Sequence, residues 1–171
     1  MSPSTEYTAT ATPSIGSYGT FDGEHGMTPK KATILVVDNS PEMLRYLQVL
    51  LELDSYAVIT ASSGYEALQF VHLGCVPDVI LLDFQMPGMD GLETLRQLRQ
   101  LRPSLNVIIC SGVDDPEIVS QAAAYGAQGY LVKPVQHLYL SAAVGRCLQP
   151  NHAEPMERAA ARVFVLPPPI A

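Results

Sequence analysis

Four polar residues each follow directly on a short apolar run, and their types suit the chemistry of phosphoryl groups. They are Asp38, Asp83, Ser111 and Lys133. An ionised aspartate is a competent nucleophile toward phosphorus. A lysine ammonium and a serine hydroxyl can hold and neutralise phosphoryl oxygens, which is most of what such a transfer requires. An Asp after a strand is also often only a turn residue or a helix cap, so this interpretation requires a fold that brings the four together.

The two aspartates need a positive charge beside them. Two carboxylates about 4 Å apart repel by roughly 4 kcal/mol at an effective dielectric constant of about 20. Such a pair persists when a cation lies with it or when one carboxylate is protonated. A hard divalent ion with oxygen ligands, most simply Mg²⁺, meets this need, and we expect Lys133 to add a second positive charge on the far side.

The apolar runs before these residues have the composition of strands in a parallel sheet. They are unbroken and rich in Val and Ile, which is typical of strands covered by helices on both faces. The runs are residues 34–37, 79–82, 107–110 and 130–132, with a less pure run at 56–60.

Segments with helical spacing of apolar residues lie between these runs. Residue types that begin or end helices mark their ends. The starts are Ser40-Pro41, Ser63 with Glu66, Asp90 with Glu93, and Asp115-Pro116; Gly126 is placed to end the fourth helix, and a last helix is predicted from about Gln136 to Leu148.

This alternation predicts an α/β domain of (βα)5 type with a five-stranded parallel sheet and helices on both faces. Right-handed crossovers place the carboxyl ends of all strands at one edge. The flavodoxin-like order 2-1-3-4-5 suits five such strands better than half of a larger nucleotide-binding fold. In that order the first and third strands are neighbours, so the site lies between them and Asp83 lies centrally among its partners. We therefore predict that Asp83 is the nucleophile.

Length and composition limit the domain boundaries, the binding partners and the cellular location that the chain can have. The sequence has 171 residues, which suits one domain, predicted over 31–149, between a flexible arm at 1–30 and a tail at 150–171. The net charge of −7 argues against direct binding of nucleic acid, and no apolar run approaches the ~20 residues that span a bilayer. Three cysteines without CxxC spacing and the lack of a secretory signal indicate a cytoplasmic protein.

The tail leaves two interpretations open. Glu154–Leu166 can form one short amphipathic helix, with Met156, Ala160, Val163 and Phe164 on one face. That segment either lies on the domain surface or serves as a partner-binding or dimer-exchange segment.

Four stretches resemble the receiver domain of bacterial response regulators in two-component signalling. They are ILVVD at 34–38, VILLDFQMPGMDG at 79–91, VIICSG at 107–112 and GYLVKP at 129–134, and the resemblance covers Thr33 to about Leu148. It implies a phosphoacceptor signalling protein rather than an enzyme. Asp83 would take the phosphoryl group from a histidine kinase or a His-phosphotransfer protein.

The resemblance also implies roles for the other residues. Asp38 would belong to an acidic Mg²⁺ pocket, completed by the backbone carbonyl of Gln85. Ser111 and Lys133 would bind phosphoryl oxygens, and Lys133-Pro134 would be a cis peptide. Ser111 and the ring of Tyr130 would move together as a switch. That switch would change the surface made by the fourth helix, fifth strand and fifth helix, where an unidentified downstream protein or a second copy would bind.

Two departures from the family pattern bear on these expectations. The family usually has two adjacent acids after the first strand, and here the second is Asn39. Its carbonyl can still ligate a metal, but the pocket loses a charge, so we expect weaker Mg²⁺ binding. Gln85 and Val113 stand at positions that influence phosphate lifetime in the family, so that lifetime stays open.

Alternative functions follow from the same residues. A phosphatase with an Asp nucleophile would want a second carboxylate two residues on, where this chain has Gln85. A receiver-like scaffold, or a weakly phosphorylated variant that acts through protein contacts alone, is supported by Asn39. Residues 150–171 are too few for an output domain, so the sequence predicts a stand-alone receiver acting on a separate partner.

Overall fold

The computed structural model describes residues 32–149 and 164–166. The strands are β1 (Thr33–Val37), β2 (Ala57–Ala61), β3 (Val79–Asp83), β4 (Val107–Ser111), β5 (Gly129–Val132) and β6 (Phe164–Leu166). The helices are α1 (Pro41–Leu53), α2 (Gly64–His72), α3 (Gly91–Leu101), α4 (Pro116–Ala124) and α5 (His137–Cys147). The first five strands and the five helices alternate along the chain, as the sequence predicts.

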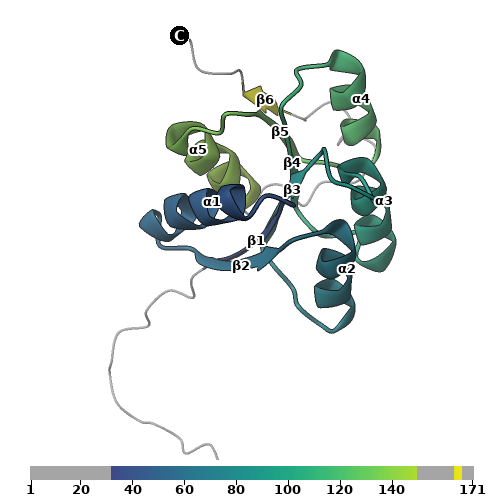
Figure 1. Cartoon of the computed structure of the whole chain (residues 1–171), viewed down its shortest axis with the longest axis horizontal. Helices are drawn as coiled ribbons and strands as arrows, with labels where there is room; N and C mark the ends of the chain where they lie inside the picture. Colours follow the sequence, from purple (N-terminus) through teal and green to yellow (C-terminus); the bar gives the residue numbers. More distant parts are fainter. Residues whose placement is uncertain (1–31, 150–163, 167–171) are drawn as a thin grey trace, which may run out of the picture.

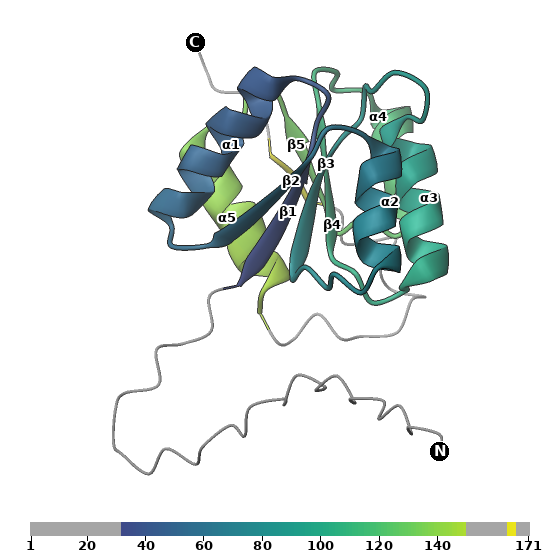
Figure 2. The same cartoon turned by 60° about the horizontal axis from the view of Figure 1, so that its bottom comes forward.

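All pairings in the sheet are parallel, and the strand order is β2-β1-β3-β4-β5-β6. Helices α1 and α5 cover one face, and α2, α3 and α4 cover the other (Figures 1 and 2). Each face has its own buried apolar cluster, one around Leu47, Leu81 and Leu140 and the other around Leu35, Leu82 and Leu95. The predicted flavodoxin-like order 2-1-3-4-5 is confirmed, and β6 adds a further strand beyond β5.

Polar caps begin four of the helices where the sequence places them. The side chains of Ser40, Ser63, Asp90 and Asp115 each accept a backbone N–H from the first turn of α1, α2, α3 and α4. Because α1 starts immediately after β1 and α3 soon after β3, these caps also fix the loops at the strand ends.

A glycine lets α3 start close to the end of β3. A Cβ atom on Gly91 would lie 2.4 Å from the carbonyl oxygen of Asp83 and 2.8 Å from the Cα of Phe84. Only a residue without a side chain fits that approach, so Gly91 helps set the position of the Asp83 backbone.

The end of the chain differs from the sequence prediction. The suggested helix over Glu154–Leu166 is wrong for residues 164–166, which form β6. Phe164 and Val165 are of the types that favour strands, and Pro167 disfavours helical backbone at Leu166. The rest of that segment, like the predicted arm at 1–30, lies outside the described residues.

No helix in the part of the chain that the structure describes is both long enough and apolar enough to cross a membrane.

Candidate functional site

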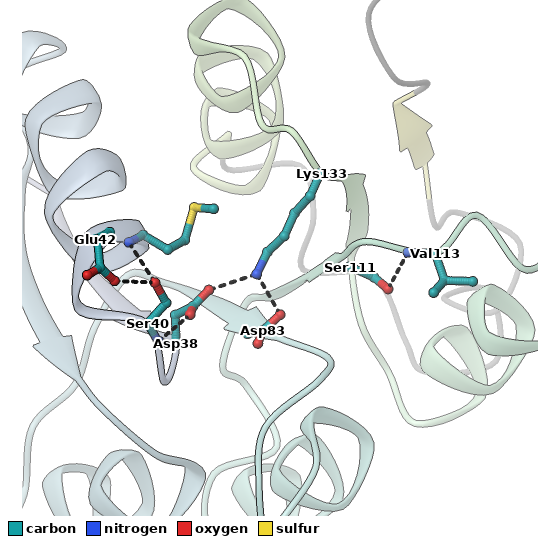
Figure 3. Close-up of polar contacts among 8 residues, drawn as sticks. Asp38, Ser40, Glu42, Asp83, Ser111, Val113 and Lys133 are labelled. Carbon is teal, nitrogen blue, oxygen red and sulfur yellow. Dashed lines mark hydrogen bonds and ion pairs between the residues drawn. The ribbon is translucent and has the colours of Figure 1, made fainter.

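The four polar residues at the strand ends lie at one edge of the sheet (Figure 3). Asp38 follows β1 directly, Asp83 ends β3, Ser111 ends β4 and Lys133 follows β5. Asp38 and Asp83 are 3% and 5% exposed, and Ser111 is fully buried. The predicted convergence of these residues is confirmed, because the parallel strands deliver all four to the same edge.

Lys133 joins the two carboxylates directly. Its Nζ donates hydrogen bonds to Asp38 Oδ2 and to Asp83 Oδ1, each at 2.8 Å. We expected the ammonium on the far side of the carboxylate pair, whereas Figure 3 shows it reaching down between them. This position places one positive charge between the two carboxylates and attracts both, which offsets part of their mutual repulsion.

The protonation of these groups follows from burial and from their neighbours. Burial raises the pKa of Asp83, hydrogen bonding to Lys133 opposes that rise, and the Asp38 charge adds to it. Burial lowers the pKa of Lys133, but the hydrogen bonds to the two carboxylates outweigh it, so that the pKa is raised overall. Lys133 therefore stays charged and supplies one positive charge to the carboxylate pair.

Asp38 is oriented by the start of α1. Its Oδ1 accepts the backbone N–H of Ser40 at 2.8 Å while its Oδ2 binds Lys133. Ser40 is also the N-cap residue of α1, so the carboxylate is held at the junction between strand and helix. Asn39 lies between them in the chain and is exposed.

Ser111 and Tyr130 both hold the backbone of Val113. The Val113 N–H donates to Ser111 Oγ at 3.1 Å, and the Tyr130 hydroxyl donates to the Val113 carbonyl at 2.7 Å. Tyr130 is fully buried, and burial raises its pKa. This link through Val113 was missed from the sequence because it uses backbone groups, which carry no residue-type signal.

The structure does not bring every predicted site residue into contact. In the part of the chain that it describes, no hydrogen bond joins Ser111 to Asp38, Asp83 or Lys133. Figure 3 places Ser111 on the other side of Asp83 from Asp38. Ser111 therefore flanks the carboxylate pair, as expected for a residue at the end of the next strand.

The donors at this edge suit a hard cation. The protein carboxylates here are those of Asp38 and Asp83. Residues 32–149 contain no cluster of three or more His, Cys, Asp or Glu side chains that could hold a metal by themselves. Mg²⁺ keeps several waters and commonly uses one or two protein carboxylates, so this donor set fits Mg²⁺. Gln85 is exposed two residues after Asp83, and its backbone N–H helps lower the pKa of that carboxyl.

Lys133-Pro134 is a cis peptide bond, as the resemblance implied. The peptide immediately follows β5 at the same edge of the sheet.

Comparison with known proteins gives one consistent result. Residues 34–145 match the family described as response regulator receiver domain. The Positive alginate biosynthesis regulatory protein of Pseudomonas aeruginosa is 37% identical over 124 residues, which are 71% of this chain and 49% of that protein. Transcriptional regulatory protein ZraR of Escherichia coli K12 is 35% identical over 127 residues, 74% of this chain and 29% of that protein.

Solved structures agree with these sequence matches. A response regulator receiver domain protein from Clostridium thermocellum superposes with a TM-score of 0.65 at 36% identity, covering 68% of this chain and 94% of that one. The chemotaxis protein CheY4 of Vibrio cholerae gives 0.65 at 31% identity, covering 69% and 99%. The chain spans about half the length, or less, of the two curated relatives. It belongs to the response regulator receiver domain family of two-component signalling systems.

Proposed function

We propose that this chain receives a phosphoryl group on Asp83 from a histidine kinase or a His-phosphotransfer protein. The observation that carries this proposal is the Lys133 ammonium bound to both Asp38 and Asp83 at 2.8 Å. It holds the Asp83 carboxylate in place at the carboxyl end of β3, with the Asp38 carboxylate close by. β3 pairs with both β1 and β4, so Asp83 is the central member of the group.

The roles of the surrounding residues follow from their positions. Attack by Asp83 on the phosphorus of a phosphohistidine forms the aspartyl phosphate and breaks the bond to the imidazole nitrogen, which leaves with that electron pair. Lys133 and Ser111 would each bind a phosphoryl oxygen. Asp38, Asp83 and the backbone carbonyl of Gln85 would hold Mg²⁺, with Asn39 as a further possible oxygen donor. Mg²⁺ supplies charge neutralisation at the phosphoryl oxygens when it is bound.

Transmission to the surface would pass through Val113. Ser111 and Tyr130 both hydrogen-bond to the backbone of this residue. If the Ser111 hydroxyl moved toward a phosphoryl oxygen, it would lose its bond to the Val113 N–H and disturb the loop between β4 and α4. The same loop carries the Val113 carbonyl that accepts the Tyr130 hydroxyl. The loop leads into α4, and Tyr130 belongs to β5. The surface of α4, β5 and α5 would then change and would bind a separate downstream protein or a second copy of the chain in the cytoplasm, without direct contact to nucleic acid or membrane.

A second candidate function is a receiver-like scaffold that acts without phosphate. Two observations favour it: Asn39 removes one acid from the pocket, and Lys133 already hydrogen-bonds to both remaining carboxylates. In that case the surfaces of the domain would bind partners in a single state.

Incubation with acetyl phosphate and Mg²⁺, followed by intact mass measurement, separates the two candidates. The native chain should gain one labile phosphoryl group, and Asp83→Asn or excess EDTA should abolish the gain. If neither acetyl phosphate nor a phosphorylated phosphotransfer protein labels the native chain, the scaffold function is correct. Unchanged labelling of Asp83→Asn would contradict the assignment of the acceptor.

Asn39→Asp tests the proposal that Asn39 weakens Mg²⁺ binding. An added carboxylate should tighten Mg²⁺ binding, because it restores a negative charge beside Asp38 and Asp83. Titration with Mg²⁺, followed by NMR of backbone amides at the strand ends, measures the affinity. An unchanged affinity would mean that position 39 does not take part in the site.

A further inference from the structure

The outer edge of the sheet is covered by a segment far along the chain. β6 runs parallel to β5, with Gly129 opposite Phe164, Tyr130 opposite Val165 and Leu131 opposite Leu166. Figure 1 shows β6 beside β5, on the side of the sheet away from β4. Without β6, β5 would be an edge strand and would present a row of unpaired backbone groups.

The backbone groups that β6 covers can be identified from the strand geometry. The Lys133 N–H donates to the Ser111 carbonyl at the end of β4. Successive N–H groups of a strand point to opposite sides, so Leu131 and Gly129 also point toward β4, while Tyr130 points toward β6. Because Tyr130 lies opposite Val165 in a parallel pair, its N–H faces the Phe164 carbonyl and its carbonyl faces the Leu166 N–H. Tyr130 is fully buried, so the pairing with β6 gives its amide a partner that it would otherwise lack.

We propose that residues 164–166 act as a strand latch, which closes the outer edge of β5 within the same chain and excludes a strand from a second copy. This edge lies between α4 and α5, so the latch occupies the middle of the surface made by α4, β5 and α5. The latch itself does not depend on phosphorylation of Asp83.

Local sequence makes the latch short and ends the sheet there. β6 has three residues, and Pro167, Pro168 and Pro169 follow it directly. Proline has no backbone N–H, so the strand cannot lengthen in that direction. Short strands flanked by proline are also poor templates for further strand addition. The latch therefore closes one edge without creating an equally reactive new one.

Hydrogen exchange of the full chain tests the latch. Leu166→Pro removes the backbone N–H that faces the Tyr130 carbonyl, and Val165→Pro, whose N–H points away from β5, is a matched control. In native chain and control, the Tyr130 amide should be protected. In dilute Leu166→Pro it should exchange at least about tenfold faster, since it loses the Phe164 carbonyl as a partner when β6 detaches. The Leu131 amide, which points toward β4, should not change and so reports that the domain stays folded.

The dependence on concentration shows whether a second copy competes for this edge. Raising the concentration of Leu166→Pro should restore protection at Tyr130 and produce a dimer in sedimentation, while the native chain stays monomeric under the same conditions. A synthetic peptide of residues 160–171 should also restore protection to the dilute variant. Unchanged exchange at Tyr130 in dilute Leu166→Pro would overturn the latch. Protection in the native chain that appears only on dimerisation would overturn its closure within one chain.

Discussion

Replacing Lys133 with methionine should destabilise the domain far more than the loss of one exposed ion pair. Methionine keeps most of the side-chain length but removes the ammonium that lies 2.8 Å from Asp38 and from Asp83. Both carboxylates would then stay buried beside each other without a counter-charge. Removing one partner from a buried ion pair typically destabilises a protein by about 3–5 kcal/mol.

The repulsion between the two carboxylates is present with and without Lys133, so the effect comes from the two attractions that the ammonium makes. At an effective dielectric constant of about 20, each attraction across 2.8 Å amounts to roughly 6 kcal/mol before the cost of burying the charges is subtracted. We therefore expect Lys133→Met to lower the free energy of unfolding by about 3–5 kcal/mol when no metal is added.

Asp83→Asn should have the opposite effect. The pKa of Asp83 is raised in the folded state, so the folded chain binds that proton more tightly than the unfolded chain. In the pH range where Asp83 is ionised in the folded chain, the raised pKa therefore lowers stability, and a neutral side chain should restore it. In the Asp83→Asn background, the loss caused by Lys133→Met should shrink to roughly half, because the ammonium then has one charged partner, Asp38, in place of two.

Urea unfolding in EDTA, followed by far-ultraviolet circular dichroism, measures these differences; the chain has no tryptophan for fluorescence. Arg96→Met is a matched control, because Arg96 pairs with Glu93 at 2.7 Å but both side chains are largely exposed. Its loss should be far smaller than that of Lys133→Met, because solvent screens an exposed pair. Equal losses from Lys133→Met with and without Asp83→Asn would refute the reasoning, since the ammonium would then not act through the Asp83 charge.

Two further predictions concern packing and thiol chemistry. Gly64→Ala should destabilise the domain by roughly 1–3 kcal/mol in urea unfolding, because the added Cβ would lie 2.1 Å from Thr94 Oγ1, and Thr94→Ala in the same chain should recover part of that loss. Burial raises the pKa of Cys110 and of Cys147 to about 12, so a thiol reagent at about pH 8 should modify the native chain at Cys75 alone, and rapid native-state labelling of Cys110 or Cys147 would contradict their burial.

Much of the fold could be predicted because local and global signals agree in this chain. Buried parallel strands are apolar on both faces, and polar caps such as Ser40 and Asp90 start the helices. The three residues of β6 could not be predicted. A run as short as 164–166 is compatible with a helix or a strand, and pairing with the β5 edge decides between them.

Part of the site could likewise be predicted from the sequence, and part of it could not. Residue types at strand ends predicted that Asp38, Asp83, Ser111 and Lys133 meet, because the sheet topology alone delivers them to one edge. The bridging position of Lys133 depends on how a long side chain settles between two charges, which the sequence does not specify. The link of Ser111 and Tyr130 through Val113 uses a backbone N–H and a backbone carbonyl, which every residue type except proline offers.

The most direct test of the central claim is to find which residue carries the phosphoryl group. After incubation with acetyl phosphate and Mg²⁺, borohydride reduces an aspartyl phosphate to homoserine, and peptide sequencing by mass spectrometry locates the change. We predict homoserine at position 83 in the native chain, with aspartate retained at position 38. Homoserine at position 38 instead, or a borohydride-resistant phosphate on Ser111, would contradict the assignment of Asp83 as the acceptor.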